Sequence, residues 1–225
     1  LKEAGLYIVF LGIESGSNTQ LERFKKGVSA EENKQAVSIL NELGIIIEPG
    51  FIMFDPLMNL DELRENIAFL ETTGLVDTTS KITGELRIQA GSAFVDMLGV
   101  SWDMLNLNTL SYPYEFEDRV VGRIFKELKE WEEQTSQLVY CLQGITRGNV
   151  PAIERSIAEQ LLIKLRRSNF DFLKACVNVK GDIQRIGEVR KSATAERNKI
   201  LGEILRLIND LSLIHISEPT RQAEI

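Results

Sequence analysis

Two short stretches carry the residues whose types and spacing could do chemistry. In the first, "YIVFLGIESGSN", an apolar run ends at Gly12 and passes directly into Glu14 and Ser15. A glycine lets the backbone come close to a ligand, a carboxylate accepts hydrogen bonds from hydroxyl or ammonium groups, and a serine hydroxyl donates or accepts. We therefore expect a polar ligand site where this run ends.

The second stretch, "GFIMFDP", begins at Gly50 and ends an apolar run with Asp55 and Pro56. Both stretches also have a purely structural interpretation. Ser17 and Asn18 could cap the helix that follows them, and Asp55 with Pro56 could form a turn.

The elements that must position these residues alternate between strand and helix over residues 6–92, which is typical of a parallel sheet covered by helices. Ligands bind such sheets at the carboxyl ends of the strands. We expect a first strand at residues 7–11 with both faces buried, because the run is continuously apolar. In "IIIEPGFIMF", Pro49 and Gly50 predict an irregular middle, with the first half a turn or an edge-like lead-in. A third strand is expected over "GELRIQA".

Three helices are expected between these strands: a short one over "NTQLERF" and two that begin with capping boxes. The boxes are Ser29 with Glu32 and Asn59 with Glu62. Helical spacing then assigns a buried stripe to each of the two longer helices. These stripes are Ala36, Ile39, Leu40 and Leu43 in the first, and Leu60, Leu63, Ile67 and Leu70 in the second.

Beyond residue 113 every long segment has a helical period, so an all-α region is expected there. Its predicted core stripes are Val121, Ile124, Leu128 and Trp131, followed by Ile200, Ile204, Leu205 and Ile208.

Composition excludes several classes of protein. The chain has 225 residues, 44% of them hydrophobic, and a net charge of −7, which argues against a general nucleic-acid surface. No apolar run of about 18 residues and no signal peptide is present, so we expect a cytoplasmic protein without a membrane partner. Cys141 and Cys176 have the spacing of neither a disulfide framework nor a metal site, and we expect buried thiols.

The two ends of the chain are expected not to be natural ends. "LKEAG" is typical of a last helical turn closed by Gly5, which predicts missing upstream sequence. "LSLIHISEPTRQAEI" resembles the translated read-through of a sequencing adapter, so residues 211–225, with the single histidine His215, are set aside as an artefactual tail that is expected to have no tertiary partners. The predicted divisions are therefore 1–112, 113–210 and 211–225.

Taken in order, the pieces "LKEAG", "VFLGIESGSN", "LERFKKGVSAEENKQAVSILNELGI", "GFIMFDP" and "NLDELRENIAFLE" resemble the radical S-adenosylmethionine enzymes. The similarity is to the large group that often carries a cobalamin-binding domain. It implies a fold that is the C-terminal part of a partial (β/α) barrel, followed by the all-α region. It also implies the cofactors of that group: S-adenosylmethionine, a 4Fe-4S cluster and, in many members, cobalamin.

The resemblance assigns roles to particular residues. The motif that begins at Gly12 lies over S-adenosylmethionine in that family, which implies that Glu14 and Ser15 contact its ribose or methionine portion. Lys26 lies where relatives have a basic residue that reaches the cofactor carboxylate. Gly50 and Ile52 match the motif that packs on the adenine.

One further segment is similar to the family's sixth strand, and it implies a substrate-side role for Arg87. There the sequence departs from the commoner residues at Gln89 to Ser92, which leaves that role open.

The family's cluster is held by three cysteines of a CxxxCxxC loop, and Cys141 and Cys176 cannot form it. We therefore expect an inactive fragment of an enzyme that, when complete, takes an electron from a donor and cleaves S-adenosylmethionine to start radical chemistry, including cobalamin-dependent methylation. No catalytic or metal-binding residue is assigned within this chain.

Two other functions stay open from the sequence. A different (β/α) barrel enzyme could use GIESGS as a phosphate-binding helix start, although Glu14 would repel a phosphate. Alternatively, the helical region could be a non-catalytic interaction module.

Overall fold

The computed structural model describes residues 2–217, with side chains described as far as residue 211. The chain divides into two compact units, Leu1–Lys126 and Glu127–Ile225, and the border lies within a helix. The predicted divisions at residues 112 and 210 stay predictions.

In the first unit the elements are η1 (Lys2–Ala4), β1 (Ile8–Glu14), α1 (Asn18–Arg23), α2 (Ala30–Glu42), β2 (Ile46–Phe51), α3 (Leu60–Thr73), η2 (Leu75–Asp77), β3 (Ile88–Gln89), α4 (Ala93–Leu98), η3 (Trp102–Met104) and β4 (Ser111–Tyr112). They are followed by α5 (Arg119–Glu133), α6 (Ser136–Arg147), α7 (Ala152–Asn178) and α8 (Ile183–Ser217).

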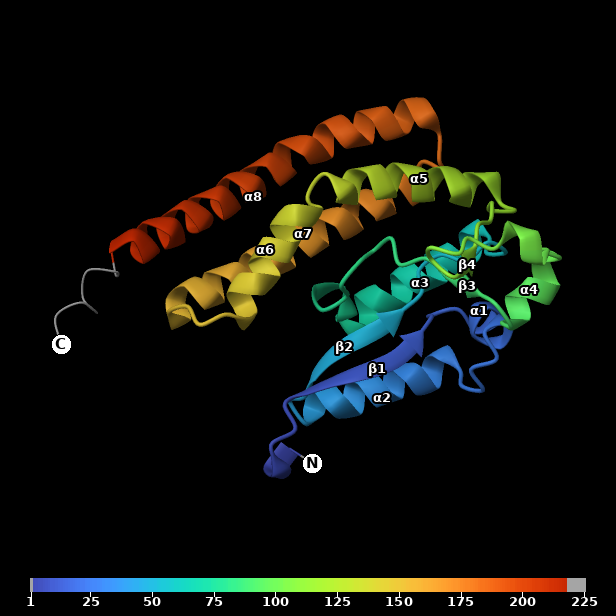
Figure 1. Ribbon diagram of the computed structural model, residues 1–225, viewed down its shortest axis with the longest axis horizontal. Helices are drawn as coiled ribbons and strands as arrows, with labels where there is room; N and C mark the ends of the chain where they lie inside the picture. Colours follow the sequence, from blue (N-terminus) through green and yellow to red (C-terminus); the bar gives the residue numbers. More distant parts are fainter. Residues whose placement is uncertain (1, 218–225) are drawn as a thin grey trace. The chain divides into compact units, whose positions relative to one another are not determined.

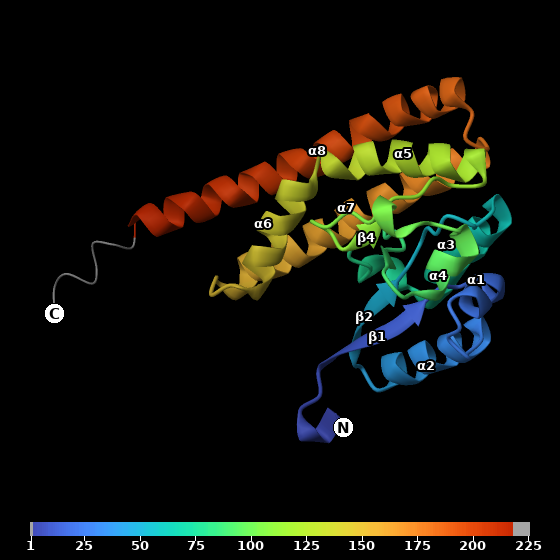
Figure 2. The ribbon, with the colours of Figure 1, turned by 45° about the vertical axis from the view of Figure 1, so that its right-hand side comes forward.

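The site is built on a parallel pair of strands, β1 and β2, in which Ile8 pairs with Ile46 and Gly12 with Gly50. The crossover between the strands is α2, which lies along one face of the pair (Figures 1 and 2). Because the strands are parallel, their carboxyl ends lie at the same edge. The residues that follow β1 and β2 are thereby brought together.

Only one face of this pair is covered, so the prediction that both faces of the first strand are buried is wrong. Ile13 is fully buried and Ile47 is 2% exposed, whereas on the opposite face Phe10 is 71% and Ile8 is 44% exposed. The apolar run is continuous because both faces carry apolar residues. In the described part of the chain, helices pack on one of them.

Of the two interpretations of the first half of "IIIEPGFIMF", the turn is wrong and the edge strand is confirmed. Its first half is a regular strand, and Pro49 pairs with Leu11 within it. Each strand of a two-stranded sheet is an edge, where the missing N–H of a proline is tolerated. The expected third strand forms only in pieces: Glu85 bridges Phe54 in the parallel sense, and β3 pairs antiparallel with β4.

The helix starts are confirmed, because both capping boxes form, at Ser29 with Glu32 and at Asn59 with Glu62. The stripe of α3 is confirmed at three residues, and Leu60 is half-buried. The stripe of α2 is wrong: Ile39 and Leu43 are exposed. The buried residues of α2 are Ala30, Asn33 and Val37.

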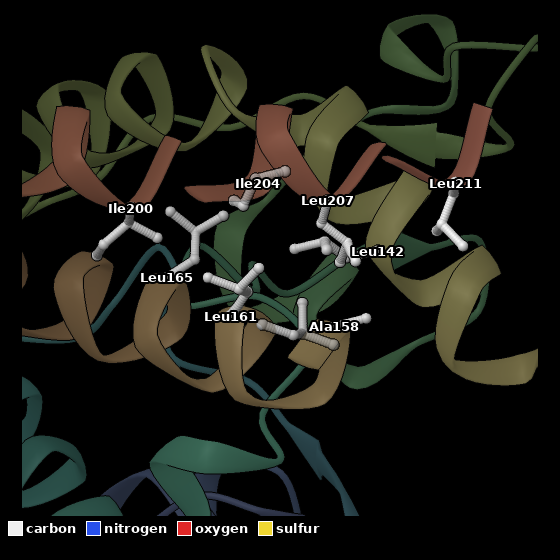
Figure 3. Packing of buried hydrophobic residues seen from close by; sticks show 9 residues of the cluster. Leu142, Ala158, Leu161, Leu165, Ile200, Ile204, Leu207 and Leu211 are labelled. Carbon is white, nitrogen blue, oxygen red and sulfur yellow. The ribbon is translucent and has the colours of Figure 1, made fainter. Parts of the chain in front are cut away.

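In the second unit, α6, α7 and α8 pack around a leucine-rich cluster (Figure 3). Ile200 and Ile204 are buried in it as predicted, whereas Leu205 is exposed and Leu207 takes its place. Leu211, which the sequence assigned to the tail, belongs to this cluster. The predicted lack of partners is therefore wrong at its first residue, while the side chains of 212–225, His215 included, lie outside the described residues.

The stripe of α5 is confirmed: its four predicted residues are fully buried. The last of them, Trp131, stacks on Phe172 with ring centroids 4.3 Å apart, and its indole N–H donates to the side-chain oxygen of Asn169 at 3.0 Å. The guanidinium of Arg197 lies 3.4 Å from the centroid of the Trp131 ring. This stack is the aromatic core of the helical unit.

Candidate functional site

The carboxyl end of β1 is a tight turn centred on Glu14. The Ser15 N–H donates to the Ile13 carbonyl at 2.8 Å, and Glu14 has a φ of 63°. A γ-turn with positive φ is the rare and strained form, and a non-glycine residue seldom adopts it. The Ile52 N–H donates to the Glu14 carbonyl at 2.7 Å, so the turn is tied to the residue that follows β2. Glu14 and Ile52 therefore lie next to each other at the carboxyl ends of β1 and β2.

The Glu14 carboxylate is paired with Lys26, whose ammonium lies 3.2 Å from it. Both side chains are partly accessible, at 25% and 33% of their surface. Lys25, directly before Lys26, also has a positive φ of 54°. Two residues with unusual backbone conformations thus frame a partly exposed ion pair, and such conformations cluster at functional sites.

Two glycines lie beside this pair. A Cβ placed at Gly12 would lie 3.0 Å from a carboxylate oxygen of Glu14 and 3.7 Å from the Lys26 nitrogen. A Cβ placed at Gly50 would lie 2.8 Å from the ring of Phe10. The Glu14–Lys26 pair and the Phe10 ring therefore lie directly against the backbone at these two positions, which leaves no room for a side chain.

Two further predicted site residues, Ile52 and Arg87, occupy different surroundings. Ile52 is half-buried and directly follows β2. Arg87 is exposed and lies between the Glu85 bridge and β3. Its substrate-side role stays a prediction.

Ser15 does not share this accessible surface, because its side chain is fully buried. Its hydroxyl lies 2.5 Å from the side-chain oxygen of Gln20 and 2.8 Å from that of Asn66, and it accepts from the Ser17 N–H at 2.9 Å. The hydroxyl therefore connects the loop to α1 and α3.

The buried network continues to an ionic group. The Gln20 amide donates to Asp55 at 2.8 Å, and Arg23 donates to the same carboxylate oxygen at 2.8 Å and to Glu62 at 2.9 Å. Burial alone would lower the pKa of Arg23, but its hydrogen bonds and attraction to the two carboxylates raise it. The arginine therefore compensates the buried charge of Asp55.

The structural interpretations can now be compared with the observed contacts. Asp55 does form a turn, because one of its oxygens accepts from the Leu57 N–H at 2.9 Å. Ser17 is at the cap position of α1 but makes no capping bond, and Asn18 instead accepts from the Ala30 N–H at 2.8 Å, at the start of α2. Asn18 thus ties α1 to the start of α2, whereas the buried Ser17 hydroxyl has no hydrogen-bond partner among the described residues.

Sequence reasoning missed three members of the network, Gln20, Arg23 and Asn66. A signal for Asn66 was present, since it is a polar residue within the apolar stripe formed by Leu63, Ile67 and Leu70. A polar residue on the buried face of a helix needs a partner, and here it has several. Gln20 gave no comparable signal, because "NTQLERF" is too short to show a stripe.

The described residues offer no metal site: no group of three or more His, Cys, Asp or Glu side chains lies close enough to hold an ion. Cys176 is buried, and burial, with the nearby charge of Glu127, raises the pKa of its thiol to about 12. Cys141 is half-buried. The expectation of a buried thiol is confirmed for Cys176 and wrong for Cys141.

A hollow of about 510 Å³ lies between α7 and α8, in the helical unit. Its lining combines apolar residues such as Phe172 and Ile200 with Lys164, whose ammonium is already paired with Glu203 at 2.8 Å. It lacks the strained backbone of the strand-end site, and we regard the latter as the candidate functional site. No helix between residues 2 and 217 is long and apolar enough to cross a membrane.

No protein-family model matches the chain. Among solved structures, the chain is similar to the cobalamin-dependent S-adenosylmethionine radical enzyme OxsB, with a TM-score of 0.76 at 20% identity over 90% of this chain. The form with aqua-cobalamin and S-adenosylmethionine bound gives a TM-score of 0.70 over the whole chain. The predicted resemblance to radical S-adenosylmethionine enzymes is confirmed. The predicted fold class, a partial α/β radical S-adenosylmethionine fold followed by helices, is confirmed as well.

A curated relative agrees with this result. 4'-Phospho-dehydrooxetanocin synthase of Priestia megaterium is 52% identical over 71 residues, which are 31% of this chain and 10% of that protein. The chain spans 38% of the first solved structure. The comparisons thus cover only part of each relative.

Proposed function

We propose that the chain is part of a radical S-adenosylmethionine enzyme, and that the carboxyl ends of β1 and β2 hold S-adenosylmethionine. The observation that carries the proposal is the Glu14–Lys26 ion pair, partly accessible at 3.2 Å and built on a strained turn. The pair lies directly against the backbone of Gly12, where a side chain would not fit. The likeness of the fold to cobalamin-dependent radical enzymes supports this choice of ligand.

Each residue at these strand ends has a chemical role in the proposal. The Glu14 carboxylate accepts hydrogen bonds from ribose hydroxyls or the ammonium group, and Lys26 binds the carboxylate of the methionine portion. Gly12 and Gly50 let the ligand approach the backbone, and Ile52 offers apolar contact to the adenine. When bound, S-adenosylmethionine supplies a sulfonium group whose reductive cleavage starts radical chemistry.

The ion pair also makes the site complementary in charge to a zwitterionic ligand. Glu14 and Lys26 neutralise each other in this structure. A ligand that carries both an ammonium and a carboxylate group can take the place of each partner in turn. Binding therefore leaves no charge unpaired, which would be costly in a partly buried site.

Other parts of the complete enzyme belong to the same proposal. We infer that it uses a 4Fe-4S cluster and cobalamin, receives its electron from a separate donor, and works in the cytoplasm. The cofactors follow from the relatives' names and the resemblance, since the described residues provide no cluster ligands.

The backbone N–H groups before α1 argue against the alternative of a phosphate-binding loop. The N–H of Gly16 already donates to the Asn66 side chain at 2.7 Å, and that of Ser17 donates to the Ser15 hydroxyl at 2.9 Å. A phosphate at the start of α1 would need such donors to be free.

The test is S-adenosylmethionine affinity, measured by calorimetry on the complete enzyme that contains this chain. Glu14→Gln should weaken binding by about 10- to 100-fold, because it removes hydrogen bonds to a charged acceptor that are worth about 1.5–3 kcal/mol. The iron content should not change. The control is Glu31→Gln, which breaks an exposed ion pair with Lys34 on α2. If Glu14→Gln lowers only thermal stability while affinity stays intact, Glu14 is structural and the proposed site is wrong.

A further inference from the structure

The strained turn at Glu14 needs support from its surroundings. A residue in a sparsely populated backbone conformation costs of the order of 1–3 kcal/mol and persists only where neighbouring contacts fix it. On the side of β2, the Ile52 N–H fixes the Glu14 carbonyl. The other side is the loop of Ser15 and Gly16, so the contacts of that loop decide whether the turn is held.

That loop is held by Asn66. The Asn66 side-chain oxygen accepts from the Gly16 N–H at 2.7 Å and lies 2.8 Å from the Ser15 hydroxyl. Its amide nitrogen donates to Gln20 at 2.8 Å and to the carbonyl of Met53 at 3.3 Å. One fully buried side chain of α3 therefore joins the segment after β1, the helix α1 and the segment after β2.

The direction of these hydrogen bonds is fixed. Because the Gly16 N–H must donate, the side-chain atom of Asn66 that faces it is the oxygen, and its nitrogen faces Gln20. The Gln20 oxygen is therefore the acceptor, and its nitrogen donates to Asp55. Asp55 is fully buried, and Arg23 compensates its charge at 2.8 Å. With these orientations each contact from Gly16 through Asn66 and Gln20 to Asp55 joins a donor to an acceptor, and the Ser15 hydroxyl can donate its single proton to only one of the two amide oxygens that it faces.

We propose that Asn66, oriented by Gln20 and Asp55, is a positioning residue that holds the Glu14 carboxylate in its ligand-binding place. The inference rests on the proposed function of the strand-end site. It adds that ligand affinity depends on a buried amide that does not itself touch the ligand. A network that served only to stabilise the core would have no such link to affinity.

The test is a double-mutant cycle for S-adenosylmethionine affinity on the complete enzyme. Asn66→Ala should weaken binding at least about tenfold in the wild-type background, because the loop loses its bond and Glu14 is no longer held. In the Glu14→Gln background the same change should cost less than about twofold, since the group that Asn66 positions is already impaired. Such coupling is what a double-mutant cycle isolates.

The matched control is Asn169→Ala in the helical unit. Asn169 is also a buried asparagine whose side-chain oxygen accepts a buried donor, the Trp131 indole N–H at 3.0 Å. This variant should lose thermal stability with unchanged affinity. Should Asn66→Ala not fold, Ser15→Ala takes its place in the cycle with an expected loss of about threefold.

The outcomes separate the two proposals. If Glu14→Gln weakens binding and the Asn66 or Ser15 change leaves affinity unchanged, or weakens it equally in both backgrounds, the positioning role is wrong and the site stands. Unchanged affinity on Glu14→Gln removes the site itself, and with it the positioning role.

Discussion

Gly16 lies so close to Phe69 that a Cβ placed on the glycine would be 2.2 Å from the Cβ of the phenylalanine. The same Cβ would be 3.2 Å from the backbone carbonyl oxygen of Glu65. Both neighbours belong to α3, one of them being backbone, so neither can move aside at low cost. The loop after β1 is therefore pressed directly onto α3, and this contact sets the distance at which Asn66 reaches the loop.

The first prediction follows from this contact. Gly16→Ala should lower the free energy of unfolding by about 2–4 kcal/mol, because the new methyl group overpacks a buried site. Gly12→Ala is the comparison, since its Cβ would meet a carboxylate oxygen at the end of the flexible Glu14 side chain at 3.0 Å. It should cost less than about 1 kcal/mol. Urea unfolding of both variants measures the difference, and equal losses would contradict the packing argument.

The second prediction separates strain from binding at Glu14. Glycine adopts positive φ without steric cost, so Glu14→Gly should leave the free energy of unfolding within about 1 kcal/mol of wild type. Glu14→Val should lower it clearly, because a β-branched residue is a genuine outlier at a φ of 63°. Thermal and urea unfolding provide the measurements. A Glu14→Gly variant that is as unstable as Glu14→Val would show that the carboxylate, and not the backbone, matters for stability.

The sequence correctly predicted those features that depend on residues close together in the chain. The capping boxes at Ser29 and Asn59 form because their hydrogen bonds lie within four residues. The stripe of α5, which includes Trp131, is buried because its spacing is unambiguous. The strand-end position of Glu14 followed from the order of apolar run and glycine.

Contacts between distant segments could not be predicted in this way. Whether Ser15 points to the ligand side or into the protein depends on Asn66, which is 51 residues away. Which face of β1 is exposed depends on which face the helices cover. The sequence could not predict this, because both faces of the strand carry apolar residues. The predicted burial of Ile39 is wrong for a related reason. The side of α2 that faces the protein interior is the one with Val37 and Asn33, and Asn33 donates to the Ile13 carbonyl at 3.0 Å.

The third prediction concerns the cation that stacks on Trp131. Arg197 donates to the Trp131 carbonyl at 2.9 Å, and its side chain has no acidic partner among the contacts described. Burial, followed by the charge of Arg190, lowers the pKa of Arg197. Arg197→Lys should therefore lower the free energy of unfolding by about 1–2 kcal/mol, since an ammonium cannot stack as a plane and is costlier to desolvate.

The control for this change is Lys199→Arg on the exposed side of α8, where Lys199 pairs with Glu196. It should alter stability by less than about 0.5 kcal/mol. Equal stability of wild type and Arg197→Lys in thermal unfolding would show that the planar guanidinium contributes nothing to the stack.

The fourth prediction uses the two cysteines. Cys176 is fully buried, whereas Cys141 is half-buried. Brief treatment of the folded protein with iodoacetamide should therefore label Cys141 and spare Cys176, with peptide mass spectrometry to tell them apart. Labelling of Cys176 should appear only after denaturation. Equal labelling of both in the folded protein would contradict the packing of α7.

The last prediction is the pH dependence that follows from Cys176. Burial, and then the charge of Glu127, raises the pKa of its thiol from 9.0 to about 12 in the folded state. Below the unfolded value both states hold the proton, so stability is unaffected there. Above it the unfolded chain releases the proton and the folded chain keeps it, so stability falls as the pH rises from about 9 towards 12.

The expected slope is at most about 1.4 kcal/mol per pH unit. The measurement is the free energy of unfolding in urea between pH 7 and 10.5, for wild type and for Cys176→Ala, which lacks the titrating group. Other lysines and tyrosines titrate equally in both proteins, so the difference between the two curves isolates the thiol. Wild type should lose more stability than the variant above about pH 9. Parallel curves would mean that the thiol of Cys176 has the same pKa in the folded and the unfolded protein. The folded protein would then accommodate the thiolate, and the thiol would not be shielded from solvent.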